Sequence, residues 1–262
     1  MKILLNHTSN TRSLSDLVNK NGKKIKENRL IRSDALNKIN ASDQLTLVKE
    51  VQLKRVIDLR CDNEASNNPD VVIDQVEYIH NPVLPNARVG ITKKGNDEED
   101  FNDFVEAIYK NGAESSVQFM TKVYQELVTS DFSNQAYKRF LEILSTPVEG
   151  ATLWHCSAGK DRAGFATILI LYVLDFSMDV IIEDYLNTNS FYQYKIEQSV
   201  QRYGEAYREV LTTIFGVNRA YIDALLKSID EKYGSFEAYV TNTLGIDAKK
   251  KEELQQLYLE EI

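Results

Sequence analysis

The 262-residue chain is long enough to bury a sizeable core, since 43% of its residues are hydrophobic. Its formal net charge of -8, with 31 Lys and Arg against 39 Asp and Glu, argues against general binding to nucleic acid or to membrane surfaces. The longest apolar stretch, residues 165–174, is far below the ~20 residues of a membrane span, and the apolar run at the N-terminus is too short for a secretory signal. We therefore expect a cytoplasmic protein without stable membrane association, and export without a readable signal stays open.

Cysteine and histidine are too sparse to suggest a metal centre. The two cysteines, Cys61 and Cys156, and the dispersed histidines His7, His80 and His155 form no credible zinc cluster along the chain. Two cysteines without a secretory signal favour a reducing compartment. We expect neither a metal nor a cofactor.

Strand-like and helix-like segments alternate in the first part of the chain. Residues 55–59 and 76–80 are typical of strands, and the first of them follows a helix-like segment that Ser42 or Asp43 could cap. Residues 151–155 predict a further strand. This alternation favours an α/β sheet whose functional loops leave the carboxyl ends of the strands, which would place Asp58 and Arg60 near the loop after residue 155.

From residue 113 onward the pattern is mainly helical, apart from the strand at 151–155. After residue 178 we expect several helices, separated at Gly216 and Gly234. One stripe at helical spacing is interpreted as a packed helix face rather than a ligand site; it consists of Val117, Met120, Tyr124 and Leu127. No linker is apparent, so we predict a single domain over 1–262 with the helical part from about 179 integral to it, and an appended helical unit remains an alternative.

A run of charged and polar residues occupies 88–100. Such runs are usually solvated connections. The alternative is a lid that delivers substrate contacts or an acid, for which Asp97 and Asp100 are candidates.

Residues 155–164 read His-Cys-Ser-Ala-Gly-Lys-Asp-Arg-Ala-Gly, so that five residues separate Cys156 from Arg162. A short apolar strand precedes this loop and a long apolar helix follows it. The loop amides would then converge at a helix N-terminus, where unpaired N–H groups and the helix dipole favour an anion. A phosphoryl dianion fits there, and we predict that the remaining loop positions contact it; these are Ser157, Ala158, Gly159, Lys160, Ala163 and Gly164.

Cys156 and Arg162 are the predicted reactive pair of this loop. The local field favours a thiolate at Cys156, which makes it a nucleophile, and Arg162 offers planar bidentate donors to two phosphoryl oxygens. Gly159 and Gly164 suit tight turns or close approach of an oxyanion. The alternative is that Cys156 is a plain buried residue. A nucleotide-binding P-loop is disfavoured because Trp154 and Asp161 stand where Gly and Ser or Thr are required, whereas a sulfurtransferase loop remains a minor alternative.

The segment from His155 to Arg162 resembles the active-site signature of bacterial and fungal tyrosine/serine protein phosphatases, relatives of the dual-specificity phosphatases. Some members also act on phosphoinositides. Further matching elements run along the chain: Asn10-Thr11-Arg12, Arg32-Ser33, Asp58-Leu59-Arg60 with Glu64, Asp184-Tyr185-Leu186 with Asn189, Tyr233-Gly234-Ser235 and Leu244-Gly245. The resemblance implies a protein-tyrosine-phosphatase-like sheet flanked by helices, a largely helical C-terminal half, inorganic phosphate in the loop, and a phosphotyrosyl protein or phosphoinositide as substrate. Asp58 and Arg60 are predicted to contact that substrate.

Two departures from the family pattern bear on turnover. The family usually carries Ser or Thr after the loop arginine, where a hydroxyl helps the thiolate to leave, and this chain has Ala163. Some members take a general acid from the loop after the second strand, where residues 82–86 hold no carboxylate. Asp161 is the other acid candidate, with bracing of the loop as its alternative role. A phosphate-binding module with little turnover therefore stays open beside the hydrolase.

Two neighbours of the predicted site have secondary roles. His155 would point to the opposite side of its strand from Cys156, so we expect it to orient the loop by hydrogen bonds. Cys61 follows Arg60 and could approach Cys156, which would allow a regulatory disulfide; its alternative is a plain small residue.

Overall fold

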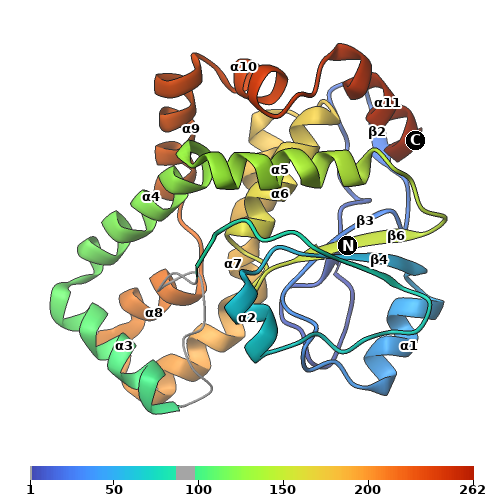
Figure 1. Ribbon diagram of the computed structural model, residues 1–262. Coiled ribbons are helices and arrows are strands. Elements are labelled where there is room, and N and C mark those ends of the chain that lie inside the picture. Colours follow the sequence, from blue (N-terminus) through green and yellow to red (C-terminus); the bar gives the residue numbers. More distant parts are fainter. Residues whose placement is uncertain (1, 87–97) are drawn as a thin grey trace.

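A computed structural model describes residues 2–86 and 98–262, and its centre is a five-stranded sheet in the order β1-β3-β6-β4-β5 (Figure 1). The strands β3, β6, β4 and β5 run parallel, and β1 is antiparallel to β3. All five residues of β6 are buried, as expected for the central strand of a sheet covered on both faces. The bounds are β1 Arg12–Ser13, β3 Leu30–Ser33, β4 Leu53–Asp58, β5 Glu77–His80 and β6 Ala151–His155.

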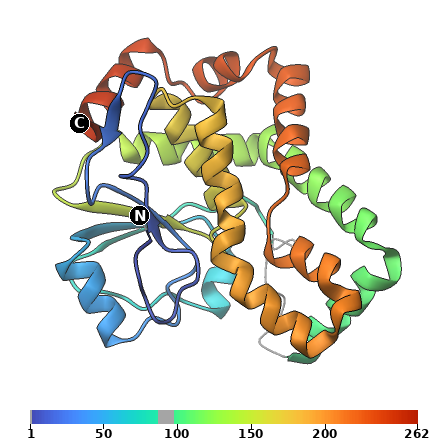
Figure 2. The same ribbon diagram turned by 180° about the vertical axis from the view of Figure 1, so that it is seen from behind.

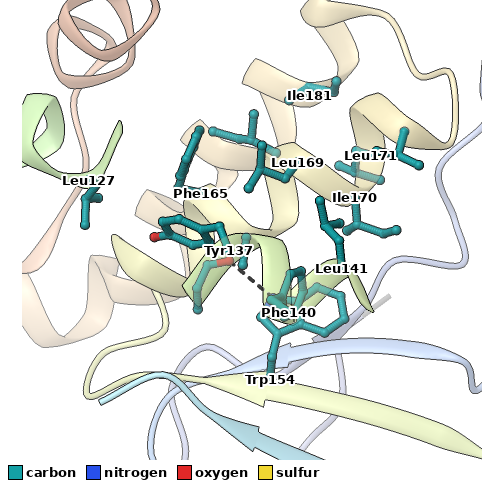
Figure 3. Close-up of a cluster of buried hydrophobic side chains, with 14 of the residues drawn as sticks. Leu127, Tyr137, Phe140, Leu141, Trp154, Phe165, Leu169, Ile170, Leu171 and Ile181 are labelled. Atoms are coloured by element: carbon teal, nitrogen blue, oxygen red, sulfur yellow. Dashed lines mark hydrogen bonds between the residues drawn. The ribbon is translucent and has the colours of Figure 1, made fainter. Parts of the chain in front are cut away.

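Helices cover both faces of this sheet. Helices α5 (Asp131–Leu144) and α6 (Arg162–Val173) lie on one face, and α1 (Ala41–Lys49) lies on the other (Figure 1). Figure 3 shows the core beneath α5 and α6, where the ring of Phe140 meets that of Trp154 at 5.4 Å in an edge-to-face contact. Side chains alternate along β6, so Trp154 faces this core while Leu153 joins the cluster beneath α1. The predicted α/β class with helices on both faces is confirmed.

The strand predicted at 151–155 is β6, and other predicted elements are present with shifted ends. The strand predicted at 55–59 is β4 at 53–58, and the helix predicted at 165–174 begins three residues earlier as α6. The prediction that Ser42 or Asp43 caps α1 was wrong. Asn40 is the N-cap, and Asp43 is the third helical residue of a reciprocal capping box, in which its carboxylate accepts from the Asn40 amide.

Most of the remaining chain is helical, in agreement with the sequence pattern. Gly216 follows α8 and Gly234 follows α9, as predicted. The predicted helix face at residues 117–127 lies on α4, where Met120, Tyr124 and Leu127 are buried. The helices are α2 Asp62–Asn67, α3 Glu98–Asn111, α4 Ala113–Thr129, α7 Met178–Tyr203, η1 Glu205–Tyr207, α8 Arg208–Phe215, α9 Arg219–Tyr233, α10 Phe236–Ala238, the π-helical η2 Tyr239–Thr243 and α11 Ala248–Tyr258.

A group of helices extends away from the sheet. Figures 1 and 2 show α3, α8 and the C-terminal part of α7 side by side, with their own buried cluster, which includes Val105, Ile196 and Leu211. Within the polar run at 88–100, residues 98–100 form the start of α3. Residues 87–97, including Asp97, lie outside the described residues.

A second, two-stranded sheet joins distant parts of the sequence. Strand β2 (Lys23–Ile25) pairs antiparallel with β7 (Leu259–Glu261). The amide of Lys26 also donates to the carbonyl of Tyr258 at 2.8 Å, which continues the pairing by one step.

Candidate active site

Residues 156–161 form the loop between β6 and α6, and the pair predicted to react lies at its two ends. Cys156 is 1% exposed and Arg162 is fully buried. Gly159 has a φ of +65°, and a Cβ at this position would lie 2.3 Å from the carbonyl oxygen of Ser33. The predicted tight turn is confirmed, because this position combines a left-handed backbone with close contact to β3.

The carbonyl groups of the loop face outward and accept hydrogen bonds from surrounding elements. The amide of Ala35 donates to the Ser157 carbonyl at 3.3 Å, and the phenol of Tyr192 donates to the Ala158 carbonyl at 2.5 Å. The Gly159 carbonyl accepts from the guanidinium of Arg32 at 2.7 Å and from the side-chain amide of Asn10 at 3.0 Å. In a trans peptide the next N–H points opposite to the carbonyl, so the N–H groups of residues 158–160 point inward. Successive inward amides form an anion-binding concavity.

A network on the β3 side holds this loop with two arginines and one aspartate. Arg12 Nε and Arg32 Nη1 both lie 3.1 Å from the carboxylate of Asp184 on α7. Burial and the neighbouring charge of Arg12 lower the pKa of Arg32 to about 10, so it remains a cation at neutral pH. Gly164 lies against the same group, since a Cβ there would be 3.2 Å from Arg32 Nη2.

A network on the β4 side has the opposite composition. Arg60 Nη2 lies 2.7 Å from Asp58 and 3.0 Å from Asp70, and His155 Nε2 lies 2.8 Å from Asp70. The ring Nδ1 of His155 lies 3.2 Å from the carbonyl oxygen of Cys156, which agrees with the orienting role predicted for it. Burial disfavours the charged imidazole, but the carboxylates of Asp58 and Asp70 raise the pKa of His155 above its ordinary value.

Asp58 and Arg60 lie beside the loop as expected, but their side chains contact each other, Asp70, the His155 ring and the carbonyl of Asn68. Their predicted contact with substrate stays a prediction. Ligand atoms of Asp58, Asp70 and His155 lie within 4.8 Å of one another, close enough for a metal ion. Arg60 already bridges the two carboxylates, so this cluster is accounted for as an ion-pair network.

Glu64, at the start of α2, fixes the plane of the Arg162 guanidinium. Its two oxygens accept from Nη1 at 2.5 Å and from Nη2 at 2.8 Å, and Oε1 also accepts from the Ser157 hydroxyl at 2.5 Å. Burial would raise the pKa of Glu64, but these bonds and the charge of Arg162 lower it to about 2. Burial opposes the charge of Arg162, but Cys156 and Glu64 raise the pKa of Arg162 further above its ordinary range.

The side chains of Lys160 and Asp161, the last two loop residues, point toward the helices. Lys160 Nζ donates to the carbonyl of Gly216 at 3.0 Å and lies 3.5 Å from Asp161 Oδ2. Asp161 Oδ1 accepts from the phenol of Tyr124 at 2.6 Å. Ala163 is fully buried, and its carbonyl accepts from the indole of Trp154.

Sequence reasoning missed the roles of several residues that support the loop. Arg12, Arg32, Glu64 and Asp184 were marked only as motif elements, and Tyr192 carried no signal. Cys61 is the N-cap of α2, where burial and the nearby Glu64 carboxylate raise the pKa of its thiol. Both cysteines are free thiols, and the regulatory disulfide remains a prediction.

Sequence comparison agrees with this geometry. Residues 3–260 match the model of a tyrosine phosphatase family. The chain belongs to the tyrosine phosphatase family. It is a phosphatase that hydrolyses phosphate esters, and its substrates are phosphorylated compounds. Among the described residues, no helix has the length and apolar character to cross a bilayer.

Three relatives extend over most of the chain. It is 28% identical over 243 residues to a Cupriavidus necator protein provisionally named a tyrosine-protein phosphatase, covering 91% of this chain and 82% of the relative. It is also 28% identical to the triple specificity protein phosphatase PtpB of Mycobacterium tuberculosis, covering 82% and 86%. A tyrosine-protein phosphatase of Nostoc commune is 23% identical, covering 87% and 72%. The similarity therefore includes the helical C-terminal half as well as the loop.

Proposed function

We propose that this phosphatase uses Cys156 as a nucleophile and passes through a phosphocysteine intermediate. The observation that carries the proposal is the set of inward amides at residues 158–160, formed because their preceding carbonyls are held outward. These amides and Arg162 stabilise charge on the equatorial phosphoryl oxygens. Arg32 and Arg162 carry positive charge near the Cys156 sulfur, so they attract the anionic phosphoryl group to the nucleophile.

The reaction has two displacements at phosphorus. The Cys156 thiolate forms the S–P bond while the P–O bond to the leaving group breaks, and Asp161 donates the proton that the leaving oxygen requires. Water then attacks the phosphocysteine and returns a proton to Asp161, so that inorganic phosphate and the thiolate are released. The proposed general acid is within the loop because residues 82–86 hold no carboxylate.

The proposed substrates are phosphotyrosyl proteins, and the proposed wider range adds phosphoseryl proteins and phosphoinositides. The family match supports the first, and the name of the M. tuberculosis relative as a triple specificity phosphatase supports the wider range. We also propose that residues 1–262 act as one catalytic domain, since the main buried cluster includes both Leu14 and Leu259.

A serine substitution tests the nucleophile. Cys156→Ser should abolish turnover of 4-nitrophenyl phosphate under reducing conditions. Inorganic phosphate should still bind to the loop, because the amides and Arg162 remain. Cys61→Ser, which also removes a buried thiol, is the matched control and should keep most of the activity. If Cys156→Ser keeps as much as about one tenth of kcat, covalent catalysis is wrong.

The second candidate is a phosphate-binding module with little turnover. Ala163 favours it, because no hydroxyl at this position assists departure of the thiolate. An aryl phosphate with a good leaving group needs little acid assistance, so total inactivity of the wild-type protein on 4-nitrophenyl phosphate would favour binding over hydrolysis.

A further inference from the structure

Two buried phenols lead from α7 to the carboxylate of Asp161. The hydroxyl of Tyr185 donates to the hydroxyl of Tyr124 at 2.8 Å, and Tyr124 donates in turn to Asp161 Oδ1 at 2.6 Å. Both phenols are fully buried and Asp161 is 1% exposed. The direction of donation is fixed, because Tyr124 has one hydroxyl proton and gives it to the carboxylate.

The two oxygens of Asp161 differ in their environment. Oδ1 has its bond from Tyr124, whereas Oδ2 is buried and has no hydrogen-bond partner among residues 2–86 and 98–262. The Lys160 ammonium lies 3.5 Å from Oδ2, within ion-pair distance, while it donates its hydrogen bond to Gly216. Buried polar atoms are usually satisfied, and an exception in a reactive loop calls for a functional reason.

We propose that Tyr124 is a positioning residue for Asp161 and that it leaves Oδ2 as the oxygen that carries the transferred proton. This inference rests on the proposed role of Asp161 as the acid. In the first displacement the proton on Oδ2 passes to the leaving oxygen as the P–O bond breaks. In the second, Oδ2 takes a proton from the attacking water. Tyr124 keeps its own proton throughout, in agreement with a phenol whose pKa is raised by burial and by the adjacent carboxylate.

Removing the Tyr124 hydroxyl separates positioning from packing. The Tyr124 ring contacts Tyr221 at 5.3 Å and Tyr185 at 6.2 Å between ring centroids, and phenylalanine preserves both contacts. Tyr258→Phe is a matched control, since Tyr258 is also a buried phenol, and its hydroxyl donates to the carbonyl of Leu144 on α5 at 2.7 Å rather than to Asp161. Melting temperatures of both variants equal to that of the wild-type protein would show that the fold is retained.

The measurement is kcat on two substrates that differ in their need for an acid, phenyl phosphate and 4-nitrophenyl phosphate. Because general acids contribute about 10²–10⁴-fold, Tyr124→Phe should lower kcat about 10- to 30-fold on phenyl phosphate and less than about threefold on 4-nitrophenyl phosphate. Tyr185→Phe should give a smaller selective loss of about threefold, since it acts only through Tyr124. Tyr258→Phe should change neither rate.

Asp161→Asn separates failure of this inference from failure of the proposed acid. If Asp161→Asn lowers kcat by the same factor on both substrates, Asp161 braces the loop, and both proposals fail. If Asp161→Asn is selective for phenyl phosphate but Tyr124→Phe is not, only the positioning role is wrong. If Tyr124→Phe adds no selective loss in the Asp161→Asn background, the two groups act as one unit, as proposed; an independent loss there would overturn the inference.

Discussion

The two ion-pair networks beside the loop at residues 156–161 have different compositions. On the β3 side, Arg12 and Arg32 share the single carboxylate of Asp184. On the β4 side, two carboxylates share Arg60, and His155 lies within ion-pair distance of both, closer to Asp70. The β3 side, which has positive charge in excess, donates directly to the Gly159 carbonyl. The β4 side reaches the loop through the His155 ring.

If the loop binds a phosphoryl group as proposed, the two networks act on it in different ways. Excess positive charge on the β3 side favours an anion in the loop. The carboxylates on the β4 side fix Arg60 and His155, and they leave the strand end in a defined orientation. We infer that removing one carboxylate lowers the stability of the protein more on the β3 side than on the β4 side, because only the β4 side retains a second carboxylate.

The largest expected effect is on the β3 side. Asp184→Asn should destabilise the protein by about 3–5 kcal/mol, since it leaves two buried guanidinium groups without a counter-ion. Urea unfolding followed by circular dichroism measures this loss. A change below about 1 kcal/mol would show that Arg12 and Arg32 do not depend on this carboxylate.

Acid titration tests the carboxylate of α2. The pKa of Glu64 is lowered to about 2 from an ordinary 4.5, so its contribution to stability is complete above pH 4.5 and is lost as the pH falls toward 2. The shift corresponds to about 3 kcal/mol. Glu64→Gln should therefore flatten the pH dependence of urea unfolding in this window. An unchanged slope would assign acid sensitivity to other groups.

A smaller effect is expected on the β4 side. Asp58→Asn should cost about 2 kcal/mol, less than Asp184→Asn, because Arg60 keeps the carboxylate of Asp70 and the carbonyl of Asn68. The two variants are compared by urea unfolding under the same conditions. Equal losses would remove the distinction between the two networks.

The smallest effect concerns Ala163, whose side chain belongs to neither network. If a missing hydroxyl slows hydrolysis of the phosphocysteine, wild-type protein mixed rapidly with 4-nitrophenyl phosphate should show a burst near one equivalent per site. Ala163→Ser should raise the steady rate by a few-fold, about 1 kcal/mol or less, and shrink the burst. Absence of both a burst and a gain would mean that formation of the phosphocysteine limits turnover.

Local patterns predicted the strands, the loop and the helix after it, because each depends on residues close in sequence. The apolar run before Cys156 and the glycine at 159 could be recognised in the sequence without knowledge of any distant residue. The networks could not be derived in this way, since Arg12 and Asp184 are 172 positions apart and burial of both charges depends on the finished fold. Motif resemblance marked these positions without indicating what they contact.

The helical stripe on α4 shows a different limit of sequence reasoning. Its periodicity correctly predicted that Tyr124 is buried, and a packed face was the simplest interpretation. Periodicity describes the ring and carries no information about the hydroxyl, which reaches Asp161. Likewise, the cap of α1 was placed two or three residues too late because Asn40, Ser42 and Asp43 are all suitable capping residues, and only the backbone distinguishes them.

The pairing of β2 with β7 has a consequence for how the protein is made. Lys23–Ile25 leaves the ribosome before its partner Leu259–Glu261, which follows every other element of the described chain. During synthesis the first strand therefore waits with an unpaired edge, and unpaired edges favour contacts with other chains. Nascent chains on one messenger are close together, so the interval before β7 emerges favours pairing of β2 with another chain.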